Sequence, residues 1–177
     1  MTMAKGGNPY AQFRVGHLYL RRSQDPSNHA VMDTKRGIEW LERAVDGGSG
    51  DAALFLALQY CTSGNSRMWG LIIPTFVKAG DLGQPVGYIK AYECYRENGH
   101  PVKSCLNLRK AIMCGFKDKT CMADLMKLYK DGLLTKNEYA LTLRRYQDAV
   151  KSMESGDRLN QLHFHRYKEI LPDHARS

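Results

Sequence analysis

The sequence predicts an all-α fold: one domain over residues 1–177, built as an α/α superhelix (solenoid) of about four helical hairpins plus a C-terminal capping helix. Four tyrosines recur at intervals of 41, 35 and 34 residues, and a break in the helical pattern follows each. A period of this length with two helices per unit is typical of stacked repeats, in which each unit contacts only its neighbours. The tyrosines are Tyr19, Tyr60, Tyr95 and Tyr129, with Val15, Leu56, Ala91 and Leu125 four residues earlier and the small residues Ala11, Ala52, Gly87 and Cys121 eight residues earlier.

The last hairpin shows the repeated pattern most clearly. Leu125 and Tyr129 lie one helical turn apart and share a face. Gly132 then ends the helix, because glycine tolerates the left-handed conformation found just past many helix ends. Thr135 and Glu138 stand in the S/T-x-x-E spacing of a capping box, in which each side chain accepts a hydrogen bond from a free backbone N–H at the next helix start. One hairpin cannot bury its apolar face, so the pattern requires neighbours of the same kind.

The ends of the remaining helices follow from glycine, proline and capping residues. Gly47-Gly48, Gly80 and Gly115 are expected to end the second helix of the first three hairpins. Asp51 is expected to cap the first helix of the second hairpin, and Pro74 to kink or shorten its second helix. The helices are predicted at about 9–20, 33–45, 51–62, 68–79, 86–98, 102–114, 119–130 and 135–153, in hairpins at about 8–48, 51–80, 85–115 and 119–153, with the cap at about 157–171.

Two segments allow two interpretations each. The connection 21–32 is long, and long loops often carry function, but an exposed tolerated insertion is favoured. The helix at 68–79 has almost no polar face, so it is either buried within the stack or marks a partner surface. Burial is the favoured interpretation.

The motif A-x-x-x-[VL]-[GA]-x-x-Y occurs twice, at Ala11, Val15, Gly16 and Tyr19 and again within 52–60. In the first unit it continues through Lys35, Trp40, Ala44 and Gly47-Gly48. This register resembles the Sel-one-like repeat, a relative of the tetratricopeptide repeat. The resemblance covers roughly residues 4–160 and implies a stack of α-helical hairpins.

The segment 129–158 is similar to the closing repeat of Sel-one-like proteins of unicellular algae. Tyr92 and Met126 depart from the family pattern, since they occupy a position that a small residue usually holds. The resemblance implies a non-enzymatic scaffold or adaptor for protein–protein interaction. Residues 4–8 resemble the tail of a second helix, which gives the expectation that the chain is the C-terminal part of a longer array or a shortened family member.

The composition favours a protein partner over other ligands. The chain has 26 Lys and Arg against 18 Asp and Glu, a formal net charge of +8, spread as +3, +3 and +2 over residues 1–45, 46–135 and 136–177. A nucleic-acid site usually concentrates its charge in one stripe, so even spreading favours a mildly basic surface that attracts acidic protein partners. A basic helical-repeat module that binds RNA is the alternative function.

No segment suggests a membrane or a secretory route. No apolar run approaches the roughly 18 residues of a transmembrane helix, and residues 1–7 lack the apolar region of a secretory signal. The expected location is therefore the cytoplasm, with no membrane partner.

No motif for catalysis, for a cofactor or for a small-molecule substrate is recognisable. The five cysteines lack metal-ligand spacing. Cys94, Cys114 and Cys121 are expected at or beside core positions as small hydrophobic residues, with a labile Cys114–Cys121 disulfide as the minor alternative. His163 and His165 lie two residues apart, so they point to different sides of a helix and cannot chelate a metal together.

The candidate partner-binding residues stand five and two positions before each repeat tyrosine, opposite the packing stripe at 100° per residue. They vary in chemistry while the packing positions stay constant. Phe55 and Leu58 resemble an apolar anchor with a polar rim; the alternative is that both pack against second helices as core. The eight candidates are Arg14 and His17, Phe55 and Leu58, Lys90 and Glu93, and Asp124 and Lys127.

Overall fold

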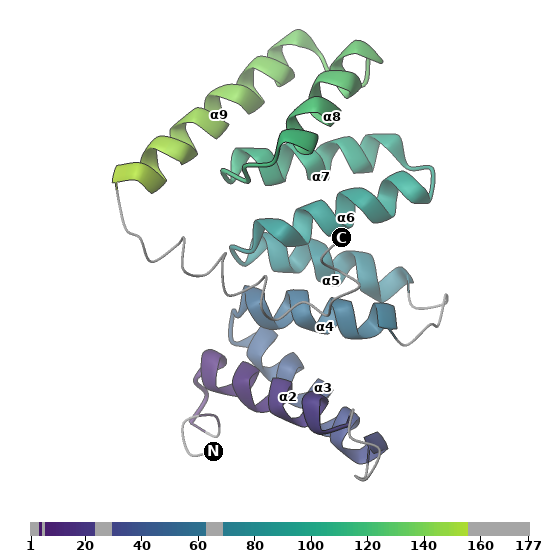
Figure 1. Ribbon diagram of the computed structural model, residues 1–177, viewed down its shortest axis with the longest axis vertical. Coiled ribbons are helices and arrows are strands. Elements are labelled where there is room, and N and C mark those ends of the chain that lie inside the picture. Colours follow the sequence, from purple (N-terminus) through teal and green to yellow (C-terminus); the bar gives the residue numbers. More distant parts are fainter. Residues whose placement is uncertain (1–3, 5, 24–29, 63–68, 156–177) are drawn as a thin grey trace.

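The computed structural model describes residues 4, 6–23, 30–62 and 69–155. Over these residues all regular structure is helical, which confirms the predicted all-α repeat fold (Figure 1). The predicted cap at 157–171, with His163 and His165, lies outside the described residues. The helices are α2 (Pro9–Ser23), α3 (Ala30–Asp46), α4 (Gly50–Thr62), α5 (Trp69–Asp81), α6 (Pro85–Glu97), α7 (Pro101–Met113), α8 (Lys119–Lys130) and α9 (Lys136–Ser155).

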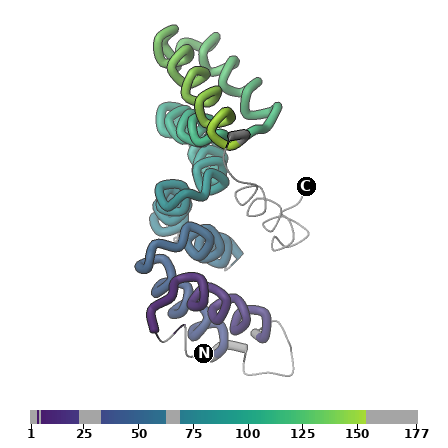
Figure 2. The backbone as a smooth tube through the Cα atoms, turned by 90° about the vertical axis from the view of Figure 1, so that its left-hand side faces the viewer, coloured from purple at the N-terminus to yellow at the C-terminus, as the bar shows by residue number. Residues whose placement is uncertain are grey.

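The helices stack in chain order into an elongated array, with α2 and α3 at one end and α8 and α9 at the other (Figure 2). From α2 to α8 each helix packs mainly on its neighbours in the sequence, whereas α9 packs mainly on α7. Three buried apolar clusters follow one another along the array, at α2–α4, α4–α6 and α6–α9. Each cluster therefore joins one hairpin to the next. We call α2, α4, α6 and α8 the first helices and α3, α5, α7 and α9 the second helices.

The helix ends confirm the capping box and correct two other expectations. The Thr135 N–H donates to Glu138 Oε2 (3.0 Å), and the Glu138 N–H donates to Thr135 Oγ1 (3.2 Å). Asp51 is not the cap of α4: the hydroxyl of Ser49 accepts from the Ala52 N–H at 3.2 Å, so the cap lies two residues earlier than expected. The connection 21–32 is also shorter than predicted, since α2 continues to residue 23 and α3 begins at residue 30.

Gly80 does not end α5 as predicted. Gly80 lies inside α5, where the ring of Tyr88 packs against it. The turn is made two residues after Asp81 by Gly83, whose φ of 90° suits glycine. The expected turns at Gly48 (φ 91°) and Gly115 (φ 81°) are found.

Pro74 does not shorten α5, which has 13 residues like α4. Pro74 is exposed, so the carbonyl of Gly70 that loses its helical partner lies on the solvent side. The hydroxyl of Thr75 donates to the Leu71 carbonyl at 2.6 Å and adds a bond in this turn. The helix tolerates proline because the lost bond is not buried.

The favoured burial of the apolar helix α5 is confirmed on one face. Ile72, Ile73 and Phe76 are buried in the α4–α6 cluster, whereas Leu71 remains 56% exposed. No helix within the described ranges is both long and apolar enough to span a membrane.

The repeat tyrosines lie at the edge of the core. Tyr60 and Tyr95 are half-buried against the α4–α6 cluster, and Tyr19 is half-buried on α2. Tyr129 is 37% exposed, with its ring stacked on Tyr139 at 4.8 Å between centroids. The tyrosines therefore cover the core from its rim.

A polar fork fixes α9 to α7. Arg109 Nη1 donates to Glu138 Oε1 at 2.8 Å, and Arg109 Nε donates to the hydroxyl of the fully buried Thr142 at 3.1 Å. The pKa of Glu138 lies below its ordinary value, chiefly because Thr135 donates to the carboxylate through its N–H and hydroxyl, and then because of Arg109. The same carboxylate thus caps α9 and orients it on α7.

Candidate partner-binding surface

Two of the four residues five positions before the repeat tyrosines, Phe55 and Asp124, lie at the seam between consecutive first helices. Phe55 of α4 is only 8% exposed, with its ring centroid 6.0 Å from Phe13 and 5.0 Å from His17 of α2. The prediction of an exposed apolar anchor at Phe55 is therefore wrong. Leu58 is half-buried against the α4–α6 cluster. Both residues are therefore part of the core packing, as the alternative interpretation predicted. That interpretation placed Phe55 against a second helix, whereas its ring packs on the first helix α2.

Asp124 occupies the corresponding seam between α6 and α8. The hydroxyl of Tyr92 donates to Asp124 Oδ2 at 2.7 Å, and Arg96 Nη1 lies 3.8 Å from the same oxygen. Burial, followed by the bond to Asp124, raises the pKa of Tyr92 to about 12. The Arg96 guanidinium also lies 5.1 Å above the Tyr92 ring. Asp124 therefore holds two first helices together.

Lys90 and Glu93 form an ion pair with each other on α6, at 2.9 Å. Both side chains are about one-third exposed, 30% and 37%. An exposed pair one turn apart contributes little to stability. The two charges remain accessible at the surface but largely satisfy each other.

The most accessible candidates are Arg14 and Lys127, at opposite ends of the array. His17 is half-buried beside Arg14, and burial, then Arg21 and Arg14, lower its pKa. It is therefore a neutral aromatic group at pH 7. The eight candidates do not form one groove: Phe55 and Asp124 join units, and the accessible ones are spread along the stack.

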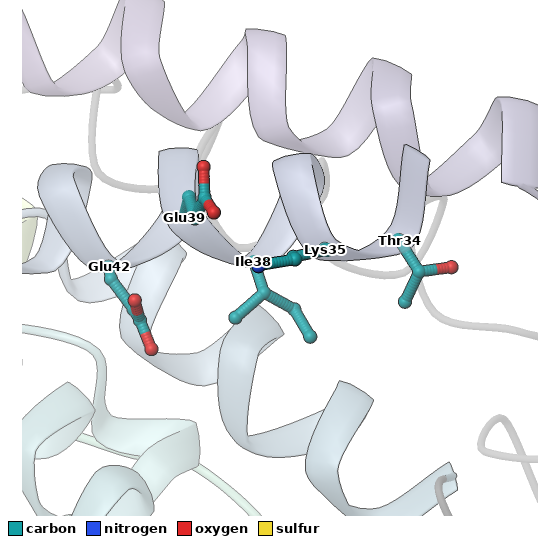
Figure 3. Close-up of a pocket in the computed structure, with 5 residues that line it drawn as sticks. All are labelled: Thr34, Lys35, Ile38, Glu39 and Glu42. Atoms are coloured by element: carbon teal, nitrogen blue, oxygen red, sulfur yellow. The ribbon is translucent and has the colours of Figure 1, made fainter. Parts of the chain in front are cut away.

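An open hollow on α3 was not recognised from the sequence. It has a volume of about 580 Å³, and Ile38 and Glu42 point to the same side of the helix (Figure 3). The hydroxyl of Tyr60 on α4 donates to Glu42 Oε1 at 3.3 Å, and burial, then Glu42, raise the pKa of Tyr60. The hollow is lined by Thr34, Lys35, Ile38, Glu39 and Glu42.

The sequence signal of this hollow is weak. Charged residues surround Ile38 on α3: Lys35 is three positions before it, Glu39 is adjacent and Glu42 is four positions after. On a single helix, this pattern cannot be distinguished from a solvent-exposed face. The hollow also depends on how the two hairpins meet, because Ile38 packs against the α2–α4 cluster and Glu42 accepts from Tyr60 of α4. An apolar floor with a charged rim suits the side chains of a bound polypeptide.

The described residues offer no assembled metal centre. Within them no three His, Cys, Asp or Glu side chains stand close enough to hold a metal ion. Of the three cysteines expected at or beside core positions, Cys94 and Cys121 are buried and Cys114 is exposed; Cys105 is buried as well. All five cysteines, including Cys61, are free thiols, so the Cys114–Cys121 disulfide is not formed.

Burial makes these thiols weak nucleophiles and gives the fold an alkaline limit. The pKa values of Cys94 and Cys121 are both raised from 9 to about 11, chiefly by burial. A raised pKa in the folded state means that the folded protein holds the proton more tightly. We expect stability to be unaffected by these thiols below pH 9 and to fall between pH 9 and 11. Urea unfolding at pH 7, 9 and 10.5 checks this, and a Cys94→Ala, Cys121→Ala variant should show a smaller decrease.

No protein-family model, curated protein or solved structure matches this chain.

Proposed function

We propose that this chain is a non-enzymatic scaffold of the Sel-one-like repeat type, which binds segments of partner proteins along its helical array. A cytoplasmic location is part of the same proposal. The observation that carries it is the open hollow on α3, which combines the apolar Ile38 with Lys35, Glu39 and Glu42. The register of Tyr19, Tyr60, Tyr95 and Tyr129 supports the family assignment.

Polypeptide recognition fits this hollow better than a small-molecule substrate. All of its lining residues come from one helix, so it is a trough without opposing walls. Small ligands are usually held in clefts that surround most of their surface. A trough along a helix suits an extended or helical segment, with an apolar side chain over Ile38 and charges on the rim.

The test reverses one rim charge. Full-length protein, a Glu39→Arg variant and an exposed control, Glu97→Arg on α6, are immobilised and exposed to extract from the source cells. Bound proteins are identified, purified and titrated back. We expect at least one partner to bind the original chain and the control equally and Glu39→Arg about tenfold more weakly, equal to about 1.4 kcal/mol. Equal binding by all three would place recognition elsewhere, and no reproducible partner would contradict the scaffold function.

A second candidate function, RNA binding, has one observation in its favour. Tyr10, Arg14, His17 and Arg21 recur at helical spacing on α2; Tyr10 is 50% exposed, and both arginines are exposed. Cations interleaved with aromatic rings suit single-stranded nucleic acid. The same protein titrated with single-stranded RNA at 50 and 200 mM salt separates the two functions. A saturable affinity that falls steeply with salt and is reduced in Arg14→Glu would favour RNA.

A further inference from the structure

The end of the array at α8 exposes positions that every other first helix buries. Seven, six and three residues before the repeat tyrosine, α6 buries Tyr88, Ile89 and Tyr92. The equivalent positions in α8 are the half-buried Met122, the exposed Ala123 and Met126, which is 47% exposed. The remaining equivalents are all buried: Gln12, Phe13 and Gly16 in α2, and Ala53, Leu54 and Ala57 in α4.

In α6, the next first helix provides part of the cover. Tyr92 is 5% exposed, and its hydroxyl bonds to Asp124 of α8. Figure 1 places α8 and α9 at the end of the array, with no further described helix beyond them. Met126 therefore lies where a following first helix would pack. Its exposure reflects the lack of a following first helix among the described residues, because the same position is buried in α2, α4 and α6, each of which has one.

The charge beside Met126 indicates what such a helix would carry. Arg96, one residue after the repeat tyrosine of α6, lies 3.8 Å from Asp124 of the following helix. The equivalent residue in α8 is Lys130, which is exposed. A helix packed on α8 in the way that α8 packs on α6 would therefore place an acid, at the position of Asp124, next to Lys130.

The outer side of α9 adds more positive charge to this end. Tyr139 stacks on Tyr129 of α8, and Glu138 and Thr142 face α7. At 100° per residue, the stripe through Arg144 and Lys151 points away from α7 and beyond α8. Its members are all exposed: Lys136, Ala140, Arg144, Gln147 and Lys151.

We propose that this end face, formed by Ala123, Met126 and Lys130 of α8 with Arg144 and Lys151 of α9, binds an amphipathic helix of a partner protein. The partner helix has a small apolar stripe flanked by acidic side chains and takes the place of a next first helix. The inference rests on the proposed scaffold function and assigns it a second surface, distinct from the hollow on α3.

Charge distinguishes this partner from two other occupants. If the end faces of two copies met, Lys130, Arg144 and Lys151 of one copy would face the same cations of the other. If the end face met the α2 end of a second copy, it would face the exposed Arg14 and Arg21. Like charges at close range disfavour both arrangements.

In the repeat register, the chain's own C-terminal segment does not place an acid at the position of Asp124. Tyr167 stands 38 residues after Tyr129, and counting it as a fifth repeat tyrosine places Leu162 at the position of Asp124. An acidic partner therefore fits the end face better than residues 156–177.

The probe is a peptide based on the helix that covers the equivalent face of α6. It has the sequence of residues 118–131 with Cys121→Ala, Lys119→Glu and Lys127→Glu, held helical by a hydrocarbon staple on its outward side. The matched peptide keeps both lysines and carries Asp124→Asn. Each is titrated into full-length protein with ¹³C-methyl methionine, and the Met126 resonance is assigned with a Met126→Leu variant.

We expect the acidic peptide to shift the Met126 methyl resonance saturably and to bind at least about tenfold more tightly than the matched peptide. Lys130→Glu should remove that preference, because the cation facing the acid is lost. Leu106→Glu, at a 49% exposed position of α7, should leave binding unchanged. Raising salt from 50 to 500 mM should weaken binding severalfold, since exposed charges are screened.

Three results would overturn the inference. The Met126 methyl group could already be shielded from a soluble relaxation agent in the free monomer, which would assign the face to residues 156–177. Its resonance could shift with protein concentration alone, with a dimer in sedimentation, which would assign it to a second copy. An accessible methyl group that ignores the peptide would mean that no such helix binds. None of these would affect the Glu39→Arg test, so the scaffold function stands or fails separately.

Discussion

Replacing Gly87 by alanine is expected to lower the free energy of unfolding by about 3 kcal/mol. A Cβ at this position would lie 2.3 Å from the Phe76 carbonyl oxygen, 2.8 Å from the Ala79 Cβ and 2.8 Å from the Gly80 N. Two of these atoms belong to the backbone of α5, so no side-chain rotation relieves the overlap. The two helices must separate, and the α4–α6 cluster loses its close packing.

Gly70→Ala is the matched control for this prediction. Gly70 lies in α5, and no heavy atom stands within 4 Å of its ideal Cβ. Alanine there should leave stability unchanged or raise it by up to about 1 kcal/mol, because glycine is the poorer helix former. Urea unfolding followed by circular dichroism measures both variants. Equal stability of the Gly87 and Gly70 variants would show that α5 and α6 do not approach through Gly87.

Replacing Phe76 by alanine is expected to cost about 3–5 kcal/mol. Phe76 is 1% exposed, and its ring lies in the α4–α6 cluster with Leu54, Ile72 and Ala91. The substitution removes the apolar area of the ring and leaves a void that helices fixed on both sides close only in part. At roughly 2–4 °C per kcal/mol for a chain of this length, the melting temperature should fall by about 6–20 °C.

Leu71→Ala provides the comparison on the same helix. Leu71 is 56% exposed, so its truncation should change stability by no more than about 0.5 kcal/mol. Thermal and urea unfolding of both variants would decide the matter. If the Leu71 variant lost as much stability as the Phe76 variant, the assignment of the buried face of α5 would be wrong.

The helices could be predicted from the sequence because their signals are local. The capping box at Thr135 and Glu138 and the turn at Gly132 depend on neighbouring residues only. The cap of α4 and the turn glycine after α5 were misplaced by two or three residues, since Ser49 and Gly83 compete with equally suitable neighbours. Such a choice depends on how the next hairpin packs.

The candidate surface was less predictable because helical periodicity describes one helix alone. Phe55 and Asp124 do lie away from the stripe of their own helix, as the 100° rule requires. In a stack, however, a first helix also meets the preceding first helix, and this second contact takes up the supposedly free side. The hollow on α3 likewise depends on how two hairpins meet, and the exposure of Met126 depends on the lack of a following first helix among the described residues.

The seam residues have a consequence for how these units can be rearranged. Phe55 meets Phe13 and His17, whereas Asp124 meets Tyr92 and Arg96. At these two seams, the later unit is therefore matched to its predecessor. A rearranged chain with the third unit directly after the first would place the ammonium group of Lys90 against the rings of Phe13 and His17, which contact Phe55 in this protein. The units of this chain are therefore not interchangeable. Their order depends on the residue that each first helix presents to the preceding first helix.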